Sequence, residues 1–199
     1  MRDRIFYPLA LLLAGLIVFL AVRPALGALP TGPVSVGDGQ YSTVTVEGTQ
    51  LNRIETGGEA RIELVREQGA TWLQIETAAG TLSDDPQLGP HFPLAADLER
   101  QFSGFEMTIT VRARPGDPPG ATQMRVNYST GREGESDWQV FDLKPDFDDY
   151  SFVYKVPVKT GENGLDYLAI RPVTPDKTRN LLIERVTFER GPRWADISG

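Results

Sequence analysis

Cysteine is absent from this 199-residue chain, and histidine occurs only once. Without cysteine the protein has no disulfide, no thiolate metal ligand, no thiol nucleophile and no attachment point for a lipoprotein lipid. The one histidine, His91 in the stretch LGPHFPL, has no second histidine with which to share a zinc ion, and no G-x-S-x-G pattern supplies a serine for it to activate. We therefore expect a protein that is not an enzyme and that needs no metal or other cofactor.

Basic residues are in the minority. The chain has 20 Lys and Arg residues against 27 Asp and Glu residues, a formal net charge of −7. A protein of this sign is repelled by the phosphates of nucleic acids. Nucleic acid is therefore excluded as a partner.

The long hydrophobic run of the chain lies at its amino end. Residues 5–22, IFYPLALLLAGLIVFLAV, carry no charge. As a helix they would span roughly 27 Å, about the thickness of the hydrocarbon core of a bilayer. We predict a transmembrane anchor within residues 1–28, with a cleaved signal peptide as the alternative. Arg2 and Arg4 favour a cytoplasmic amino terminus. The prediction thus places the protein in a bacterial inner membrane with its larger part in the periplasm. For an exported domain, the absence of cysteine fits bacteria better than eukaryotes, whose secreted domains usually carry disulfides.

The rest of the chain divides into three parts. Residues 29–39, LPTGPVSVGDG, are rich in Pro and Gly and predict a linker; residues 40–190 predict one folded domain, and residues 191–199 a tail. Within the domain, short runs with alternating or β-branched residues are separated by turn motifs such as KTGENG (159–164). This pattern predicts an all-β fold, an antiparallel β-sandwich of about nine strands with the strand order of a jelly roll, and a single short helix. The strands are expected at residues 41–47, 60–65, 71–77, 105–114, 122–129, 138–143, 150–156, 168–172 and 181–188, and the helix at 93–100.

The order of motifs in residues 94–188 resembles a known class of domain. GFEMTITVRARPG, MRVNYSTG, SDWQVFDL, DDYSFVYKVP, DYLAIRPV and LLIERVTF follow one another. This order resembles the jelly rolls of carbohydrate-binding modules, within the broad galactose-binding-like group. The resemblance implies a β-sandwich that binds glycan without catalysing a reaction. The chain departs from the family at Glu184, where the family commonly has an aspartate that supports structural calcium. Because glutamate is longer by one methylene, we expect no metal there.

Aromatic and polar side chains on outward faces form the candidate ligand site. In TWLQIET (71–77), two apolar residues alternate with polar ones, so Trp72 is expected to point outward. The same alternation places polar or aromatic side chains outside in TQMRVNYS and YLAIRP. An exposed ring can stack on the C–H face of a sugar while neighbouring polar groups bond its hydroxyls. The predicted ligand-binding residues are Trp72, Arg125, Asn127, Tyr167 and Arg171.

Two acidic turns offer other chemistry. EGESDWQ (133–139) could supply the paired carboxylates of a glycoside hydrolase, and KPDFDD (144–149) could chelate calcium. The first lies in a Gly-rich turn rather than in a strand, and the second lacks the Gly and Glu of an EF-hand loop. We interpret both as solvated turns and assign Trp138, beside the first, a structural role.

The last two predicted strands flank the polar stretch VTPDKTRN (173–180). We interpret this segment as the closing hairpin of the sandwich, with a solvated loop.

Two functions are compatible with these features. The first is a non-catalytic, membrane-anchored binding module that contacts envelope glycan. The alternative is an accessory or scaffolding subunit of a membrane protein complex, which would dock through its exported sandwich and through small residues of its single helix, such as Ala10, Ala14 and Gly15. The membrane is a partner in both.

Overall fold

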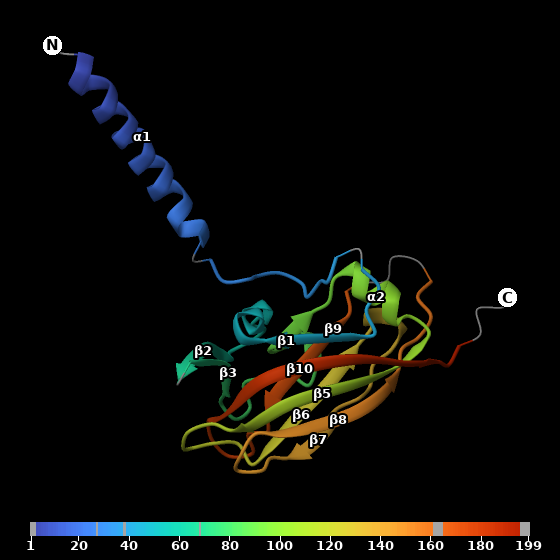
Figure 1. Cartoon of the computed structure of the whole chain (residues 1–199). Coiled ribbons are helices and arrows are strands. Elements are labelled where there is room, and N and C mark those ends of the chain that lie inside the picture. The colour runs from blue at the N-terminus through green and yellow to red at the C-terminus, as the bar shows by residue number, and fades with distance from the viewer. Residues whose placement is uncertain (1–2, 27, 38, 68, 161–164, 196–199) are drawn as a thin grey trace. The chain divides into compact units, whose positions relative to one another are not determined.

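The computed structural model of the chain describes residues 3–26, 28–37, 39–67, 69–160 and 165–195. The chain divides into two compact units, Met1–Pro30 and Thr31–Gly199, and Figure 1 shows their elements. Residues 161–164 of the predicted KTGENG turn and residues 196–199 of the predicted tail lie outside the described residues.

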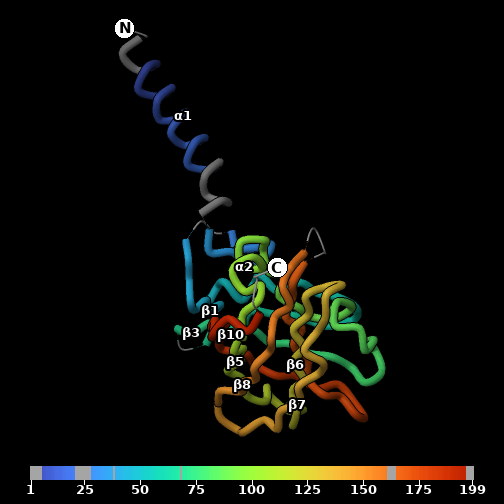
Figure 2. Tube along the Cα trace, turned by 90° about the vertical axis from the view of Figure 1, so that its right-hand side faces the viewer, coloured from blue at the N-terminus to red at the C-terminus, as the bar shows by residue number. Residues whose placement is uncertain are grey.

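The second unit is a sandwich of two antiparallel sheets. Its larger sheet has the order β2-β3-β10-β5-β8, with β1 also paired to β10, and its smaller sheet has the order β4-β9-β6-β7. The two sheets form separate layers in the side view of Figure 2. The strands are β1 (Thr43–Glu47), β2 (Arg61–Glu67), β3 (Ala70–Thr77), β4 (His91–Pro93), β5 (Phe105–Pro115), β6 (Gln123–Ser129), β7 (Gln139–Asp142), β8 (Asp148–Lys155), β9 (Tyr167–Pro172) and β10 (Arg179–Arg193).

Side-chain alternation along these strands builds the core between the sheets. Met107, Ile109 and Val111 of β5 are buried, as the sequence pattern predicts for one side of a half-buried strand. All nine predicted strands are present, which confirms the antiparallel sandwich. The tenth strand, β4, was not predicted because three residues are too short to display alternation.

Helices are short in the sandwich. The predicted helix forms as α2 (Ala96–Phe102), which buries Leu98 and Phe102. The remaining helical turns are η1 (Gly48–Arg53), η2 (Pro86–Leu88) and η3 (Gly131–Glu133).

The predicted closing hairpin is wrong. Strand β9 pairs with β4 and β6 in the smaller sheet, whereas β10 pairs with β1, β3 and β5 in the larger one. Residues 173–178 therefore cross from one sheet to the other. Alternation indicates which side chains face the core, but it does not identify the strand that pairs with a given strand.

The stretch predicted as a linker packs in part onto the sandwich. Val34 is buried, its amide donates to the carbonyl of Pro93 at 2.8 Å, and its carbonyl accepts from the amide of Ala95 at 2.9 Å. An apolar side chain with two backbone hydrogen bonds offsets the entropy of ordering this segment. At the other end of the sandwich domain, β10 continues to Arg193, beyond the predicted boundary at residue 190.

One end of the core contains a buried polar cluster. The ammonium of Lys159 lies 2.6 Å from Asp166 Oδ1 and 2.9 Å from Glu99 Oε2. The hydroxyl of Tyr128 donates to Asp166 Oδ2 at 2.8 Å, and the amide of Asp166 donates to Glu99 Oε1 at 2.9 Å. Burial raises the pKa of the Asp166 carboxyl even though Lys159 and Tyr128 donate to it. Burial alone would lower the pKa of Lys159, but its hydrogen bonds to Asp166 and Glu99 outweigh that effect and raise it.

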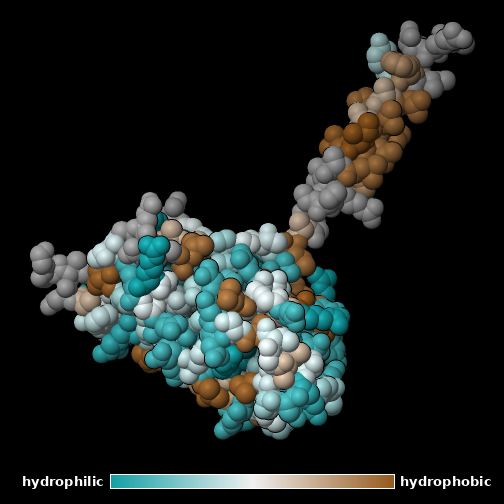
Figure 3. Space-filling view, turned by 180° about the vertical axis from the view of Figure 1, so that it is seen from behind, coloured by the Kyte–Doolittle hydropathy of each residue, from teal (hydrophilic) through white to brown (hydrophobic). Residues whose placement is uncertain are grey.

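The first unit is the helix α1 (Asp3–Leu26). Its side chains from Phe6 to Leu20 are exposed and almost all apolar, and they form the hydrophobic surface of the helix in Figure 3. Across the residues that the structure describes, no helix reaches the length and hydrophobicity that crossing a bilayer requires. The transmembrane part of the prediction is therefore not supported by the structure.

Candidate functional site

Four of the five predicted ligand-binding residues lie on one surface, the outward side of β6 and β9. On these strands Val126, Leu168 and Ile170 face the core, so their sequence neighbours face away from it. Arg125 lies opposite Arg171 across the strand pair. We call this outward side of the smaller sheet the small-sheet face. It contains Arg125, Asn127, Tyr167 and Arg171.

Trp72 lies elsewhere. It belongs to β3 in the larger sheet, where its ring centroid is 5.3 Å from that of Phe147 and 5.5 Å from the guanidinium carbon of Arg114. The structure thus separates Trp72 from the other four predicted residues. Alternation correctly indicated an outward side chain, but two sheets offer two outward faces, and the pattern does not distinguish them.

A loop covers much of the small-sheet face. The guanidinium of Arg171 donates to the carbonyls of Ser83 at 2.5 Å, Asp85 at 2.7 Å and Pro86 at 3.0 Å. These acceptors belong to residues 78–90, which join β3 to β4 and which we call the covering loop. As a result the side chain of Arg171 is fully buried.

The environment of Arg171 is unusual for an arginine. Burial, together with the nearby positive charge of Arg125, lowers the pKa of Arg171 to about 10. The covering loop approaches so closely that a Cβ atom at Gly89 would lie 2.5 Å from Arg171 Nη2. Glycine is therefore the residue that fits this point of the loop.

Two more predicted residues are buried on the same face. Asn127 Nδ2 donates to Glu135 Oε2 at 3.3 Å, and the ring of Tyr167 packs against that of His91 at 5.4 Å. Both point outward from the sheet, as predicted, but neither is open to solvent. A strand pattern indicates the side of the sheet to which a residue points, and a distant segment can still cover that side.

A partly exposed strip remains at the β7 edge. Two guanidinium groups lie over the indole ring of Trp138. The guanidinium carbon of Arg125 is 4.5 Å from the ring centroid, and that of Arg171 is 4.8 Å from it. Its Nε1 donates to the carbonyl of Asp84 at 3.0 Å, while Arg125 Nη1 donates to the carboxylate of Asp84 at 3.1 Å. Val140 is exposed beside it. We call Arg125, Trp138 and Val140 the Trp138 surface.

A hollow adjoins the Trp138 surface. It has a volume of about 220 Å³ and is lined by Arg125 together with Gly80, Leu82 and residues 172–175. Arg125 therefore borders both the indole and the hollow. The arrangement offers an aromatic ring, a fixed cation and a concave surface at one place.

Sequence reasoning assigned Trp138 a structural role and did not place it on the outward side, although a signal for that position was present. In WQVFDL the side chain of Phe141 packs against the core, so Trp138 and Val140 are outward by alternation. If Phe141 is taken as facing the core, alternation along the strand places the side chain of Trp138 on the outward side of the sheet.

Three of the acidic residues noted in the sequence, Asp148, Asp149 and Glu184, take part in ion pairs. Glu184 accepts from Arg112 Nε at 2.5 Å, and Asp149 lies 3.3 Å from Arg112 and 3.2 Å from Arg185. Asp148 pairs with Lys144. Within the described part of the chain, no group of three or more His, Cys, Asp or Glu side chains is arranged to hold a metal ion.

Comparison with known proteins gives matches only at the level of structure. The sequence matches no protein-family model and no curated protein. The CBM22-2 xylan-binding domain of Paenibacillus barcinonensis Xyn10C is similar with a TM-score of 0.53 at 10% identity, over 74% of this chain and 99% of that one. A xylan-binding domain from CBM22 has a TM-score of 0.48 at 19% identity, over 81% of this chain and 100% of that one.

A longer structure is also similar. The CBM22-1–GH10 modules of Clostridium thermocellum Xyn10B, complexed with xylohexaose, give a TM-score of 0.45 at 15% identity. The match covers 71% of this chain but only 26% of that one. The likeness to the P. barcinonensis domain, at 10% identity, concerns the fold, which is a β-sandwich of the kind found in carbohydrate-binding modules.

Proposed function

We propose that the sandwich is a non-catalytic glycan-binding module and that it binds through the Trp138 surface. The observation that carries this proposal is the half-buried indole of Trp138, which lies beside the guanidinium of Arg125 and near a hollow that Arg125 also lines. The fold supports the proposal, because the similar P. barcinonensis domain is a xylan-binding domain.

The chemistry of the surface suits a sugar. The indole of Trp138, with the guanidinium groups of Arg125 and Arg171 beside it, offers an apolar, electron-rich surface to the C–H groups of a pyranose ring. The guanidinium of Arg125 has several N–H donors for hydroxyl oxygens. The hydrogen bond from Trp138 Nε1 to Asp84 holds the ring in place before a ligand arrives, which lowers the entropy cost of binding.

Replacing Trp138 with alanine is expected to weaken binding of soluble xylan at least tenfold, since stacking on an aromatic ring is a main source of affinity at such a site. Affinity electrophoresis of the full-length protein in gels containing xylan measures this. The matched control is Trp72→Ala, which removes an indole from the outward face of the other sheet and is expected to leave binding unchanged. Arg125→Gln provides a second test that leaves the indole intact.

Two outcomes would contradict the proposal. One is wild-type protein that migrates identically with and without xylan, β-glucan or peptidoglycan fragments. The other is a Trp138→Ala protein, shown to be folded by circular dichroism, that is retarded as strongly as the wild type.

We also propose that the apolar run at residues 5–22 attaches this module to a bacterial membrane, with the sandwich in the periplasm. Its support is the uncharged sequence and the exposed apolar side chains of α1. The protein is then expected in the membrane fraction after carbonate washing, and a variant with Leu12, Leu16 and Leu20 changed to Ser should move to the soluble fraction. Recovery of the wild type in the soluble fraction would contradict this.

Co-migration with a large complex in mild detergent would favour the accessory-subunit alternative.

A further inference from the structure

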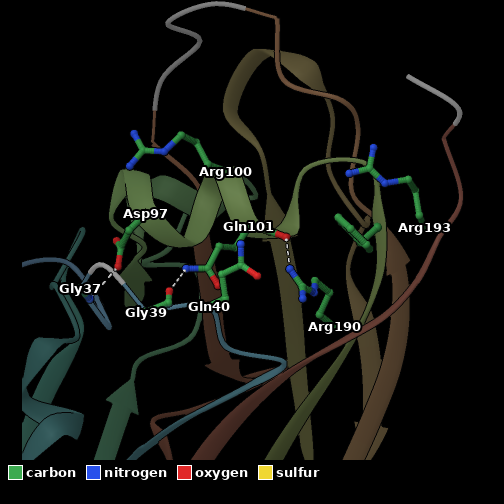
Figure 4. Close-up of a pocket in the computed structure, with 9 residues that line it drawn as sticks. Gly37, Gly39, Gln40, Asp97, Arg100, Gln101, Arg190 and Arg193 are labelled. Atoms are coloured by element: carbon green, nitrogen blue, oxygen red, sulfur yellow. Dashed lines mark hydrogen bonds between the residues drawn. The ribbon is translucent and has the colours of Figure 1, made fainter. Parts of the chain in front are cut away.

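A second concave site lies at the α2 end of the sandwich. It has a volume of about 540 Å³, within the range of small-molecule sites, and Figure 4 shows the residues around it. Its walls come from Gly37, Gly39, Gln40, α2, the start of β5 and the end of β10. We call it the arginine pocket. Its lining includes Arg100, Gln101, Phe105, Arg190 and Arg193.

A β-bulge directs two of these arginines to the same ring. In a regular strand, residues 190 and 193 would point to opposite faces because their spacing is odd. The pairing of β10 with β5 shifts register between Arg190 and Arg193. As a result the guanidinium carbons of Arg190 and Arg193 lie 4.8 and 4.7 Å from the ring centroid of Phe105. Bulges commonly redirect side chains at sites of function.

These cations have no anionic partner within the part of the chain that the structure describes. Among the described residues, Arg100, Arg190 and Arg193 form no ion pair. Arg190 makes one long hydrogen bond, from Nη1 to the carbonyl of Gln101 at 3.4 Å. Both guanidinium groups border the same pocket, so an anion bound there would be attracted by two positive charges.

The one described carboxylate of the pocket is already engaged. Asp97 Oδ2 accepts from Ser35 Oγ at 2.9 Å and from the amides of Val36 and Gly37 at 2.9 and 3.0 Å. Figure 4 shows Asp97 turned toward Gly37, on the side of the pocket away from Arg190 and Arg193. Burial acts to raise its pKa, but the hydrogen bonds from Val36 and Ser35 prevail and lower it. Asp97 therefore holds the 35–37 segment and does not neutralise the two arginines.

We propose that the arginine pocket binds the carboxylate of an acidic sugar, with Arg190 and Arg193 as its ligands. A guanidinium presents paired donors that match a carboxylate. The exposed amide of Gln40 borders the pocket and can donate to a sugar hydroxyl. The amide of Gln101 instead positions the wall, since its Nε2 donates to the carbonyl of Gly39 at 2.8 Å and its Oε1 accepts from the amide of Tyr41 at 3.0 Å. The assignment of the ligand as a sugar rests on the proposed function. Its assignment as an anion rests on Arg190 and Arg193.

The test is an NMR titration of the full-length protein at low salt with glucuronate, glucose or inorganic phosphate. Glucuronate is expected to shift amide signals of residues 100–106 and 189–193, and glucose is not. The double variant Arg190→Gln, Arg193→Gln should bind glucuronate at least tenfold more weakly, because two charge-assisted contacts are lost. Arg61→Gln removes an exposed arginine on β2, away from the pocket, and should have no effect. Arg190→Lys keeps the positive charge but lacks the paired N–H donors of a guanidinium, so it should reduce the affinity for glucuronate by an intermediate amount.

Different results would contradict different parts of the proposal. If glucuronate at low salt shifts no amide signals, or if the double variant binds glucuronate as well as the wild type does, the anion site is overturned. Equal binding of phosphate and glucuronate would overturn its assignment to a sugar acid. Xylan binding through the Trp138 surface should persist in the double variant, and glucuronate binding should persist in Trp138→Ala, so failure of one site does not imply failure of the other.

Discussion

Replacing Lys159 with methionine is expected to lower the free energy of unfolding by about 3–5 kcal/mol at pH 7, the cost of leaving buried charges without their partner. Lys159 is the cation between Glu99 and Asp166, and the side chain of Asp166 is fully buried while that of Glu99 is nearly so. Without the ammonium, two carboxylates face each other in a region of low dielectric constant. Urea denaturation of the full-length protein, followed by circular dichroism, measures the loss.

The pH dependence of this loss distinguishes charge from packing. Burial already raises the pKa of the Asp166 carboxyl, and in the variant the loss of the ammonium raises it further above its unfolded value, so the folded state binds more protons. Its stability is then recovered as the pH falls from 7 toward 5, and the difference from the wild type shrinks. Adding Glu99→Gln to the variant should recover part of the stability at pH 7, because a single carboxylate then remains.

The matched control is Lys155→Met. Lys155 is exposed and pairs with Glu106 at 3.5 Å, so the expected loss is below about 1 kcal/mol. Equal losses for the two lysines, or a Lys159→Met deficit that does not change between pH 7 and 5, would show that the buried cluster does not depend on its cation.

Replacing Arg171 with methionine is expected to cost about 2–4 kcal/mol and to release the covering loop. The three carbonyls that Arg171 holds would lose a charged donor while buried or partly buried. Hydrogen exchange at residues 82–90 should accelerate by more than tenfold, because the loop loses its main attachment to the sheet. Arg171→Lys should recover little of this stability, since one ammonium cannot reproduce the planar array of N–H donors of a guanidinium.

Arg125→Met is the control for this prediction. It removes the neighbouring arginine on the same face, but its partner Asp84 is 92% exposed, so the loss should stay within about 1 kcal/mol. Unchanged exchange of residues 83–86 in Arg171→Met would contradict the role of Arg171 in holding the loop. The sequence pattern suggested the opposite role for Arg171, that of an exposed ligand contact.

Several features of the site lay beyond sequence reasoning. The burial of Arg171 depends on acceptors as far as 88 residues away along the chain. The joint position of Arg190 and Arg193 depends on a bulge, which a strict alternation cannot predict. Trp138 is the exception, since the outward side of β7 could be counted from Phe141.

The sequence by itself determined the class of fold. Alternating apolar residues and glycine-rich turns predicted nine of the ten described strands and the inward side of most of them, because the direction of a side chain in a strand depends on its position in a local repeat of two. The tertiary structure decided which strands pair, that Trp72 lies on a different sheet from Arg125, and that the covering loop buries Arg171. These outcomes depend on hydrogen bonds and packing between segments distant in the chain. The two-residue alternation along a single strand contains no information about such contacts.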